Sequence, residues 1–162
     1  MNKLIDYIQT QYPKSKDWFT ENEIGLSYFD VPTVELTEFC FFLHTDTELY
    51  FDQLACLTGL DERKENGCFT VVYNLFSFIY KHKVDLRVRT QDTPIPSLTS
   101  IWGAANWHER EAYDLFGIEF ENHPDLRRIL LPEDWEGHPL RKDYTAQEKY
   151  HGITVKYEPP LA

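Results

Sequence analysis

The alternation of apolar and polar residues is clearest in the middle of the chain, where it predicts two β-strands. Residues 83–89 read KVDLRVR, in which Val84, Leu86 and Val88 alternate with charged side chains. Residues 68–80 (CFTVVYNLFSFIY) are rich in the β-branched and aromatic side chains that strands favour. Only a short polar break separates the two runs, so they indicate an antiparallel hairpin with one face on the core and one in water.

Helical spacing of apolar residues predicts three helices. They are residues 4–8, ending before Pro13; residues 34–44, with Thr33 as a potential N-cap; and residues 104–116, ending at Gly117. In the third helix, Trp107, Ala112, Leu115 and Phe116 form an apolar stripe, and we expect Trp107 to lie in the core together with Trp102.

Weaker patterns fill the remainder of the chain. We expect a first strand at 24–31, a strand or short helix at 51–60 that ends at Gly59, a polar turn at 61–67, a short helix containing Ile101 and capped by Ser97 or Thr99, and a short strand at 153–157. Strands and helices in this order favour an α+β fold, with an antiparallel or mixed sheet covered by helices. We assign this domain to residues 1–120.

Residues 121–162 differ in kind, because prolines punctuate an otherwise apolar segment. Pro124, Pro132 and Pro139 each remove a backbone donor and push the preceding residue towards extended geometry. The intervening leucines and Trp135 are too apolar for a free tail. We therefore interpret residues 121–162 as an extended C-terminal segment that needs a surface, and expect it to bind a partner.

Composition and charge exclude several classes of protein. A net charge of −11, with no basic run longer than two residues, argues against nucleic-acid binding and against direct contact with an anionic membrane. No apolar run approaches the roughly 20 residues of a membrane span, and the N-terminus lacks a signal-peptide core, so export is not expected. Three isolated cysteines (Cys40, Cys56 and Cys68) fit thiols in a reducing compartment.

Ionisable residues are concentrated between residues 106 and 144, yet they form no recognisable catalytic pattern. His108 and Glu109 invite comparison with a zinc-protease helix, but Ala112 stands where the second histidine would be, and Asp114 would have to replace it. A free-standing metal hydrolase using His108, Glu109 and Asp114 is therefore one alternative. No phosphate loop or dinucleotide motif is present.

Partner contact is the interpretation that we favour for these charges. Arg110 and Asp114 have the spacing of a helical ion pair. The four charges of this helix (Glu109, Arg110, Glu111 and Asp114) are expected to face either water or partner charges. Arginines and lysines of the C-terminal segment would clamp carboxylates on a partner, with Trp135, Leu140 and Tyr144 as anchors. We expect Arg141 to lie at this contact, so that Arg141→Glu would impair assembly and leave the melting temperature of the isolated domain nearly unchanged.

Three runs, EREAYDLFGI (109–118), HPDLRRIL (123–130) and GHPLRKDY (137–144), carry a family resemblance. Together they resemble the signature of the thirty-kilodalton subunit, also called the C subunit, of the proton-translocating NADH:quinone oxidoreductase, respiratory complex I. The residues that we carry over as signature and partner interface are Glu109, Arg110, Glu111, Tyr113, Asp114, Gly117, His123, Pro124, Arg127, Arg128, Trp135, Pro139, Leu140, Arg141, Lys142, Asp143 and Tyr144.

The resemblance implies a structural subunit without catalytic residues, cofactors or metals of its own. FMN and iron–sulfur clusters would lie in partner subunits, which pass electrons from NADH to quinone. The partners would be the subunits related to D, B and I, on the cytoplasmic face of the bacterial inner membrane, with membrane contact only through the complex. Without a fused D-type domain, we expect a separate subunit. Equivalent subunits of membrane-bound hydrogenases and photosynthetic quinone-reducing complexes remain alternatives.

Overall fold

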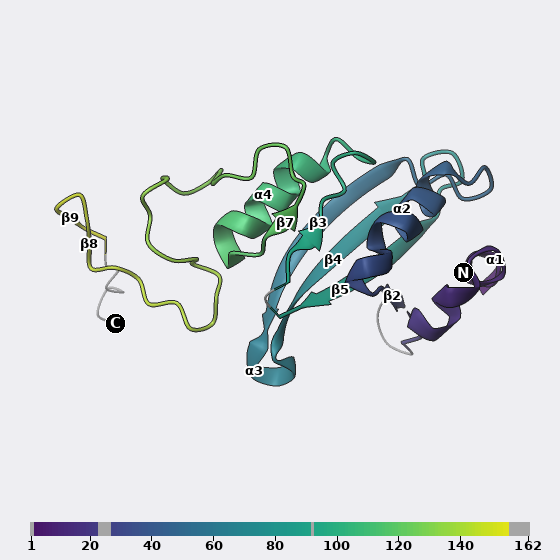
Figure 1. Cartoon of the computed structure of the whole chain (residues 1–162), viewed down its shortest axis with the longest axis horizontal. Helices are drawn as coiled ribbons and strands as arrows, with labels where there is room; N and C mark the ends of the chain where they lie inside the picture. Colours follow the sequence, from purple (N-terminus) through teal and green to yellow (C-terminus); the bar gives the residue numbers. More distant parts are fainter. Residues whose placement is uncertain (1, 23–26, 92, 156–162) are drawn as a thin grey trace, which may run out of the picture.

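A mixed five-stranded sheet forms the centre of the molecule (Figure 1). The computed structural model describes residues 2–22, 27–91 and 93–155. The strands, in their order across the sheet, are β1 (Phe19–Thr20), β2 (Tyr28–Asp30), β5 (Lys83–Thr90), β4 (Cys68–Phe76) and β3 (Gln53–Glu62). Neighbours are antiparallel except β2 and β5, which run parallel with Phe29 beside Leu86. The predicted α+β class with a mixed sheet is confirmed.

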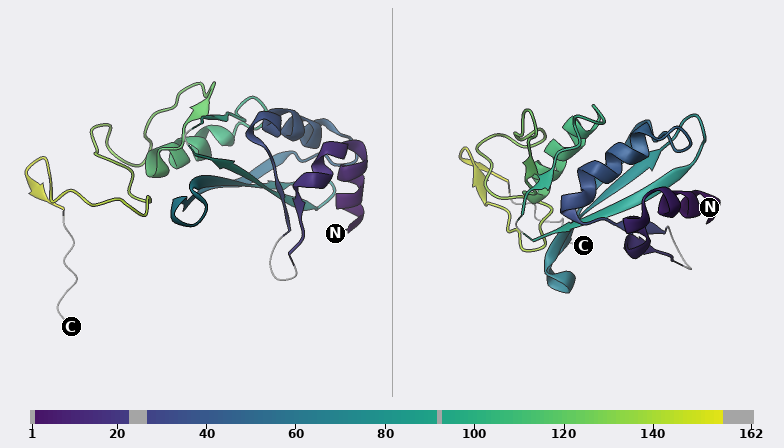
Figure 2. Two further views of the ribbon diagram at one scale, coloured as in Figure 1. Left: turned by 60° about the horizontal axis from the view of Figure 1, so that its bottom comes forward. Right: turned by 45° about the vertical axis from the view of Figure 1, so that its right-hand side comes forward.

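Helices α2 and α4 cover one face of this sheet, as both views in Figure 2 show. The helices are α1 (Asn2–Gln11), α2 (Leu36–Thr45), α3 (Arg63–Asn66) and α4 (Ala105–Phe116), with 3-10 turns at Pro13–Trp18 and Thr33–Glu35. Two-residue strands complete the fold: β6 (Ile95–Pro96) beside β7 (Phe120–Glu121), and β8 (Lys149–Tyr150) beside β9 (Ile153–Thr154). None of the described helices is long and apolar enough to cross a membrane.

The predicted hairpin of β4 and β5 lies at the middle of the core. Val71 and Tyr73 of β4 align with Val88 and Leu86 of β5, and all four side chains are fully buried under the helices. On the opposite face of β5, Lys83 and Arg89 are exposed and Arg87 is half-buried, whereas Asp85 is buried and accepts from Asn74 Nδ2 at 2.7 Å. Alternation along β5 therefore predicted the apolar core side chains correctly, and Asp85 is the exception on the polar face.

Aromatic rings fill the core between α1 and α2. Phe39 of α2 is fully buried and packs with its ring centroid 5.1–5.6 Å from those of Tyr12, Trp18 and Phe29. Such pairs each contribute roughly 0.5–1.5 kcal/mol beyond the burial of their area. This cluster fixes α1 and the 3-10 turn after it against the helix that covers the sheet.

Several local predictions were wrong or incomplete. The ambiguous run 51–60 belongs to strand β3, and Gly59 lies inside the strand, where a Cβ atom would come within 2.7 Å of the Phe116 ring. Residues 98–101 form a turn in place of the predicted helix. Thr33 does not cap α2, since its hydroxyl donates to Arg89 O.

Two further predictions concern the N-terminal strand and the tryptophans. Strand β2 covers only Tyr28–Asp30 of the predicted strand 24–31, and residues 24–26 lie outside the described part of the chain. Trp102 is buried as predicted, and its indole N–H donates to Phe51 O. Trp107 is 60% exposed, so the prediction that it belongs to the core is wrong.

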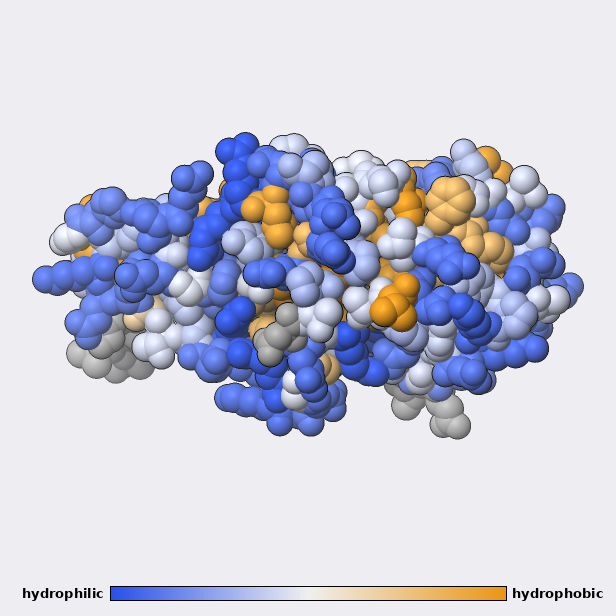
Figure 3. Space-filling model, viewed as in Figure 1, coloured by the Kyte–Doolittle hydropathy of each residue, from blue (hydrophilic) through white to orange (hydrophobic). Residues whose placement is uncertain are grey.

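After β7 the chain leaves the sheet and forms an extended loop beside the C-terminal end of α4 (Figure 1). This end of the molecule is predominantly hydrophilic in Figure 3. The apolar patches lie over the sheet and the helices that cover it. The predicted strand at 153–157 is represented by β9 (Ile153–Thr154), and residues 156 and 157 lie outside the described range.

Candidate functional site

Helix α4 supplies the framework on which the signature residues are arranged. Its run from Ala105 to Phe116 contains no proline or glycine, and it ends at Gly117, whose φ of 72° is left-handed. The N–H of Gly117 donates to Tyr113 O, which closes the last turn. Glycine adopts this backbone conformation without the steric cost that a Cβ atom would add. The predicted end of the helix is thus confirmed.

The carboxylate of Asp114, near the end of α4, lies at the centre of a buried cluster of donors. Its Oδ2 atom accepts three successive backbone N–H groups, from Ile129 (3.0 Å), Leu130 (2.7 Å) and Leu131 (2.9 Å). Its Oδ1 atom accepts from Arg128 Nη1 at 2.7 Å, and the side chain is fully buried. We call this arrangement the Asp114 cradle. It holds the C-terminal segment against α4.

Two opposing effects set the pKa of the Asp114 carboxyl. Burial alone would raise it, but the backbone N–H donors and the Arg128 guanidinium together lower the pKa below its ordinary value. The carboxylate is therefore charged at neutral pH and compensated inside the chain. This contradicts our expectation that the charges of the signature helix face water or a partner, at least at this position.

The open carbonyls at the end of α4 are also capped by the C-terminal segment. His138 Nδ1 donates to Asp114 O at 2.8 Å, the backbone N–H of Leu140 donates to Leu115 O at 3.1 Å, and Arg141 Nε donates to Phe116 O. A helix leaves its last four carbonyls without partners and carries partial negative charge there. Donors from the segment satisfy three of these groups. Two of the three accept from a cationic side chain, because Arg128 Nη1 also donates to Asp114 O at 3.1 Å.

Arg141 was expected at a partner contact, but the structure places it inside this cap. Besides its bond to Phe116 O, its guanidinium lies 5.3 Å from the centre of the Phe69 ring. An added Cβ atom at Gly117 would meet Arg141 Nη2 at 2.2 Å, so the glycine also makes room for the cap. The reason given for Arg141→Glu leaving the isolated domain unchanged is therefore wrong.

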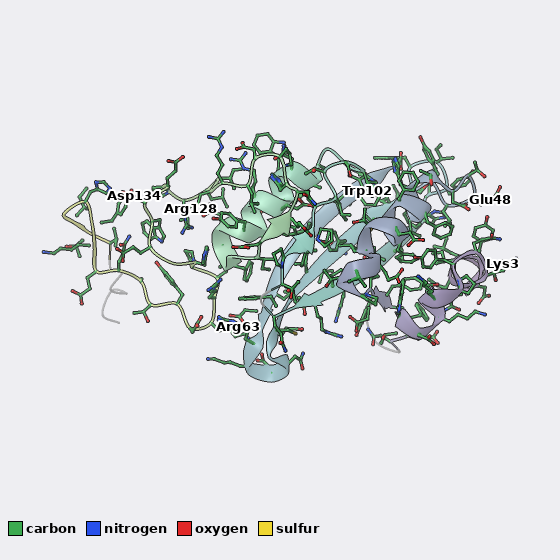
Figure 4. The ribbon with its side chains drawn as sticks, viewed as in Figure 1. Lys3, Glu48, Arg63, Trp102, Arg128 and Asp134 are labelled. Atoms are coloured by element: carbon green, nitrogen blue, oxygen red, sulfur yellow. The ribbon has the colours of Figure 1, made fainter. Side chains whose placement is uncertain are left out.

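Two arginines bridge α4 and the segment by binding backbone carbonyls. Arg110 donates to the carbonyls of residues 127 and 128, each at 3.2 Å. Arg128 donates to the carbonyls of Trp135 and Gly137, both at 2.9 Å, and lies between the end of α4 and the returning segment (Figure 4). The ion pair of Asp114 is thus with Arg128, and the predicted pair with Arg110 is wrong.

Glu109 forms a second buried site, one turn earlier on α4. Its carboxyl is fully buried and accepts from Ser97 Oγ at 2.7 Å and from the backbone N–H of Leu98 at 2.8 Å. Burial raises the pKa of this carboxyl to about 7, against the opposing effect of the two donors. Glu109 therefore fastens the loop after β6 to the helix, and does not face water or a partner.

His123 lies beside Glu109, with its Nε2 atom 3.9 Å from Glu109 Oε2. The same nitrogen is 3.2 Å from Asn106 O, and the backbone N–H of Asp125 donates to Nδ1 at 3.0 Å. These two contacts assign the proton to Nε2 and leave Nδ1 as the acceptor. His123 thus anchors the start of the C-terminal segment to α4.

The far part of the segment is anchored at the end of β3. Asp61 Oδ2 accepts from the backbone N–H of Lys142 at 2.8 Å, and Arg63 pairs with both Asp61 and Asp143 (2.8 and 2.5 Å). Figure 4 shows Arg63 where the segment passes the sheet. No sequence pattern marked Asp61 and Arg63, because they lie in a polar stretch and their partners are about 80 residues away in the chain.

Trp135 and Tyr144 were expected to anchor a partner, and the structure places them against one another. The indole N–H of Trp135 donates to Tyr144 Oη at 3.1 Å, and both side chains are half-buried. Gly137, with φ of 77°, lies so close that an added Cβ atom would be 3.0 Å from the Tyr144 ring. The pair closes the loop of the segment on itself.

The remaining predicted interface residues are more accessible. Tyr113 and Pro139 are half-buried, Leu140 is 51% exposed, and the exposed group contains Glu111, Pro124, Arg127, Lys142 and Asp143. A role for them in partner binding stays a prediction, as does the boundary at residue 120.

The geometry does not support a hydrolytic metal site on α4. Glu109 binds the loop at Ser97, whereas Asp114 binds the amides of residues 129–131, so the two carboxylates serve different neighbours. The described part of the chain contains no cluster of three histidine, cysteine or acidic side chains arranged to hold a metal ion. Both carboxylates accept hydrogen bonds from backbone N–H groups and so hold the neighbouring segments in place.

Comparison with known proteins gives a family match over most of the chain. Residues 29–150 match the family described as "Respiratory-chain NADH dehydrogenase, 30 Kd subunit". The match includes β2 to β5, α4 and the docked segment as far as β8.

Two similar proteins are both described as the C subunit of NADH-quinone oxidoreductase. The one from Chloroherpeton thalassium is 48% identical over 141 residues, which cover 85% of this chain and 58% of that protein. The one from Chlorobium phaeobacteroides is 44% identical over 156 residues, covering 94% of this chain and 93% of that protein. The chain thus spans little more than half of the first relative and nearly all of the second.

A solved structure supports the fold assignment. It is described as "Nqo5 of the trypsin-resistant fragment (1-134)", and it is 31% identical to this chain with a TM-score of 0.61. The similarity covers 77% of this chain and 98% of the fragment.

Proposed function

The chain belongs to the family of the 30-kDa subunit of respiratory-chain NADH dehydrogenase, and we propose that it serves as a structural subunit in the peripheral arm of a proton-translocating NADH:quinone oxidoreductase. In this role it carries no FMN or iron–sulfur cluster of its own. Electrons pass from NADH to quinone through cofactors that neighbouring subunits hold.

The observation that supports this proposal is the use that the chain makes of its signature residues. Asp114, Arg110 and Arg128 are engaged in holding the C-terminal segment on α4, and Glu109 holds a loop. Charged residues used in this way give the segment a defined shape before any partner arrives. A preformed surface lowers the ordering cost of association, which suits a subunit that is assembled into a larger complex.

We further propose that the partners are the subunits related to D, B and I, and that the assembly lies on the cytoplasmic face of the bacterial inner membrane. The exposed side chains of the segment, such as Arg127, Leu140 and Asp143, would contact them. Membrane association would come through the complex.

Purification of the tagged chain from membranes solubilised in mild detergent tests the proposal. We expect the eluate to reduce quinone with NADH, and the chain expressed alone to show no flavin or iron–sulfur absorbance. An eluate that is active with a hydrogenase-type electron donor, and not with NADH, would assign the chain to a related membrane complex. A chain recovered alone from native membranes would overturn the proposal.

A matched pair of variants links this test to the structure. Asp114→Asn removes the charge of the cradle, whereas Asp125→Asn removes a charge that is 51% exposed on the same segment. We expect Asp114→Asn to reduce the amount of complex recovered at least several-fold, and Asp125→Asn to leave it unchanged. Equal recovery for both variants would show that the docked segment is not needed for assembly.

A further inference from the structure

Strand β3 is an open edge of the main sheet. It is ten residues long (Gln53–Glu62), and within the described part of the chain it pairs only with β4. The opposite edge is β1, which has two residues. In an antiparallel ladder alternate residues direct their N–H and C=O groups to the same side, so about half of β3 points these groups away from β4. Of the two edges of the described sheet, β3 is therefore the longer one.

Most of β3 lacks the features that protect an edge, because its charged residues, Asp61 and Glu62, lie at the end of the strand. Natural edge strands are kept from pairing by short length, proline, charged side chains or bulges. Residues 53–60 read QLACLTGL, with no proline and no charge, and one irregularity lies near the start of the strand, between Leu54 and Cys56. Among the described residues, no backbone hydrogen bond from outside the sheet reaches residues 53–60. The edge is therefore available for pairing.

A shallow apolar groove follows the same edge. It has a volume of about 140 Å³ and is lined by Leu57, Thr58 and Gly59 of β3, by Glu111, Ala112, Leu115 and Phe116 of α4, and by Leu140. Small-molecule sites usually measure about 300–1,000 Å³, so this groove suits a single aliphatic side chain better than a ligand. Three consecutive residues of β3 form one wall, which places the groove along the strand.

We infer that β3 receives an extended strand from a neighbouring subunit, which adds to the sheet and places one aliphatic side chain in the groove. This inference rests on the proposed function as a subunit of a complex. Main-chain hydrogen bonds would supply affinity, and the groove would select the side chain, as in other cases of strand addition. Leu140 contributes to the wall of the groove, so the docked C-terminal segment is part of the receiving surface.

The charges around the groove indicate a basic strand. Glu111 is the one ionisable residue in the groove lining, and it is exposed. A lysine or arginine next to the aliphatic side chain would pair with it, and the chain as a whole has a net charge of −11. A second copy of this chain fits less well, because it would bring the acidic surface against itself.

Hydrogen exchange of the assembled complex and of the free chain tests the inference. We expect amides in residues 53–60 that exchange rapidly in the free chain to exchange at least tenfold more slowly in the complex. Residues 34–41, which span the end of the 3-10 turn and the first part of α2, provide an internal reference. A complex that is active with NADH but leaves 53–60 at the rate of the free chain would overturn the inference and leave the proposed function standing.

A pair of double variants gives a second readout. Thr58→Lys with Leu60→Lys places two positive charges on the open edge, at side chains that are exposed in the free chain. Val34→Lys with Phe41→Lys makes a matched change on α2 and the 3-10 turn before it, where the two side chains are 89% and 58% exposed. We expect the first pair to lower recovery of the complex at least fivefold and the second pair to leave it unchanged, with both proteins folded by circular dichroism.

The remaining outcomes are distinguishable. A free chain that sediments as a dimer, with residues 53–60 already protected, would assign the edge to a second copy and overturn the inference. Failure of the wild-type chain to enter any complex would instead contradict the proposed function. Equal recovery for the two double variants would show that the edge is not used.

Discussion

The sheet with its helices and the C-terminal segment are held together by different forces. The sheet domain packs fully buried aromatic and aliphatic side chains, such as Phe39, Tyr73 and Leu86, between α2, α4 and the strands. The segment contributes few buried apolar side chains, and it is held by donors that surround Asp114 and the last carbonyls of α4. Apolar burial is cooperative over a whole domain, whereas a polar anchor acts on the atoms that it binds.

This difference predicts that the two regions respond separately to mutation. Damage to the core should lower the stability of the whole chain, and damage to the Asp114 cradle should release the segment first. The predictions that follow test the separation, beginning with the change of largest expected effect.

Phe39→Ala should destabilise the entire chain, by about 3–5 kcal/mol, because it leaves a cavity in a fully buried aromatic cluster. Urea denaturation followed by circular dichroism measures this loss. Trypsin should then cut the variant throughout its length. A variant with an unchanged unfolding midpoint, or with cleavage confined to the C-terminal segment, would show that the two regions are not stabilised as described.

Asp114→Asn should free the segment at a local cost of about 1–3 kcal/mol for each donor left without a partner, and more for the unpaired Arg128. We expect cleavage by trypsin after residues 127, 128 and 141 to accelerate at least tenfold, with a much smaller change in the unfolding of the core. The fragments are identified by mass spectrometry, with Asp125→Asn as the control. Global unfolding equal to that of Phe39→Ala would contradict a separate anchor.

Glu109→Gln tests a titratable contact between α4 and the sheet domain. Burial raises the pKa of Glu109 from 4.5 to about 7, so between these values the folded chain binds more protons than the unfolded chain. The contribution of Glu109 is therefore fully present below pH 4.5 and is lost as pH rises through 7.

The glutamine should avoid this loss, so that its stability relative to wild type increases by on the order of 2 kcal/mol from about pH 5 to about pH 8. Urea denaturation at the two pH values measures the difference. The exposed Glu111→Gln serves as the control, and we expect its difference from wild type to be the same at both. If the stabilities of Glu109→Gln and wild type changed in parallel with pH, the raised pKa assigned to Glu109 would be contradicted.

Lys142→Ala should have the smallest effect. Its ammonium group pairs with Glu65 at 2.7 Å, but both side chains are largely exposed, and such ion pairs contribute little in water. We expect no measurable change in melting temperature or in tryptic cleavage after residues 127 and 128, which the substitution leaves intact. A clear loss in either would show that surface ion pairs, as well as the cradle, hold the segment.

Much of the sheet domain follows from local patterns in the sequence. Alternation at 83–89 identified β5 and its buried side chains, and Gly117 marked the end of α4. Strand β3 was left open between a strand and a short helix, and its end was placed too early, since Gly59 looks like a terminator until its contact with Phe116 is seen. Trp107 was placed in the core because it follows the apolar stripe, but its ring lies outside, near Arg110.

The candidate site could be predicted in composition but not in its contacts. The sequence marked Asp114, Arg128 and Arg141 as unusual, and the spacing of Arg110 and Asp114 suggested a local pair. The actual partners of Asp114 come from residues 128–131, in a segment without periodicity. A carboxylate that collects successive backbone N–H groups is invisible to side-chain patterns, because every residue except proline carries that donor.

The parallel pairing of β2 with β5 bears on how the chain emerges from the ribosome. Phe29 aligns with Leu86, and all of β3 and β4 lie between them in the chain. Because synthesis proceeds from the N-terminus, β2 and the residues before it must wait until β5 has been made. Contacts so distant in sequence slow folding, since a long loop must close before they form. The N-terminal part of the sheet should therefore be among the last to be completed, although it is the first to be translated.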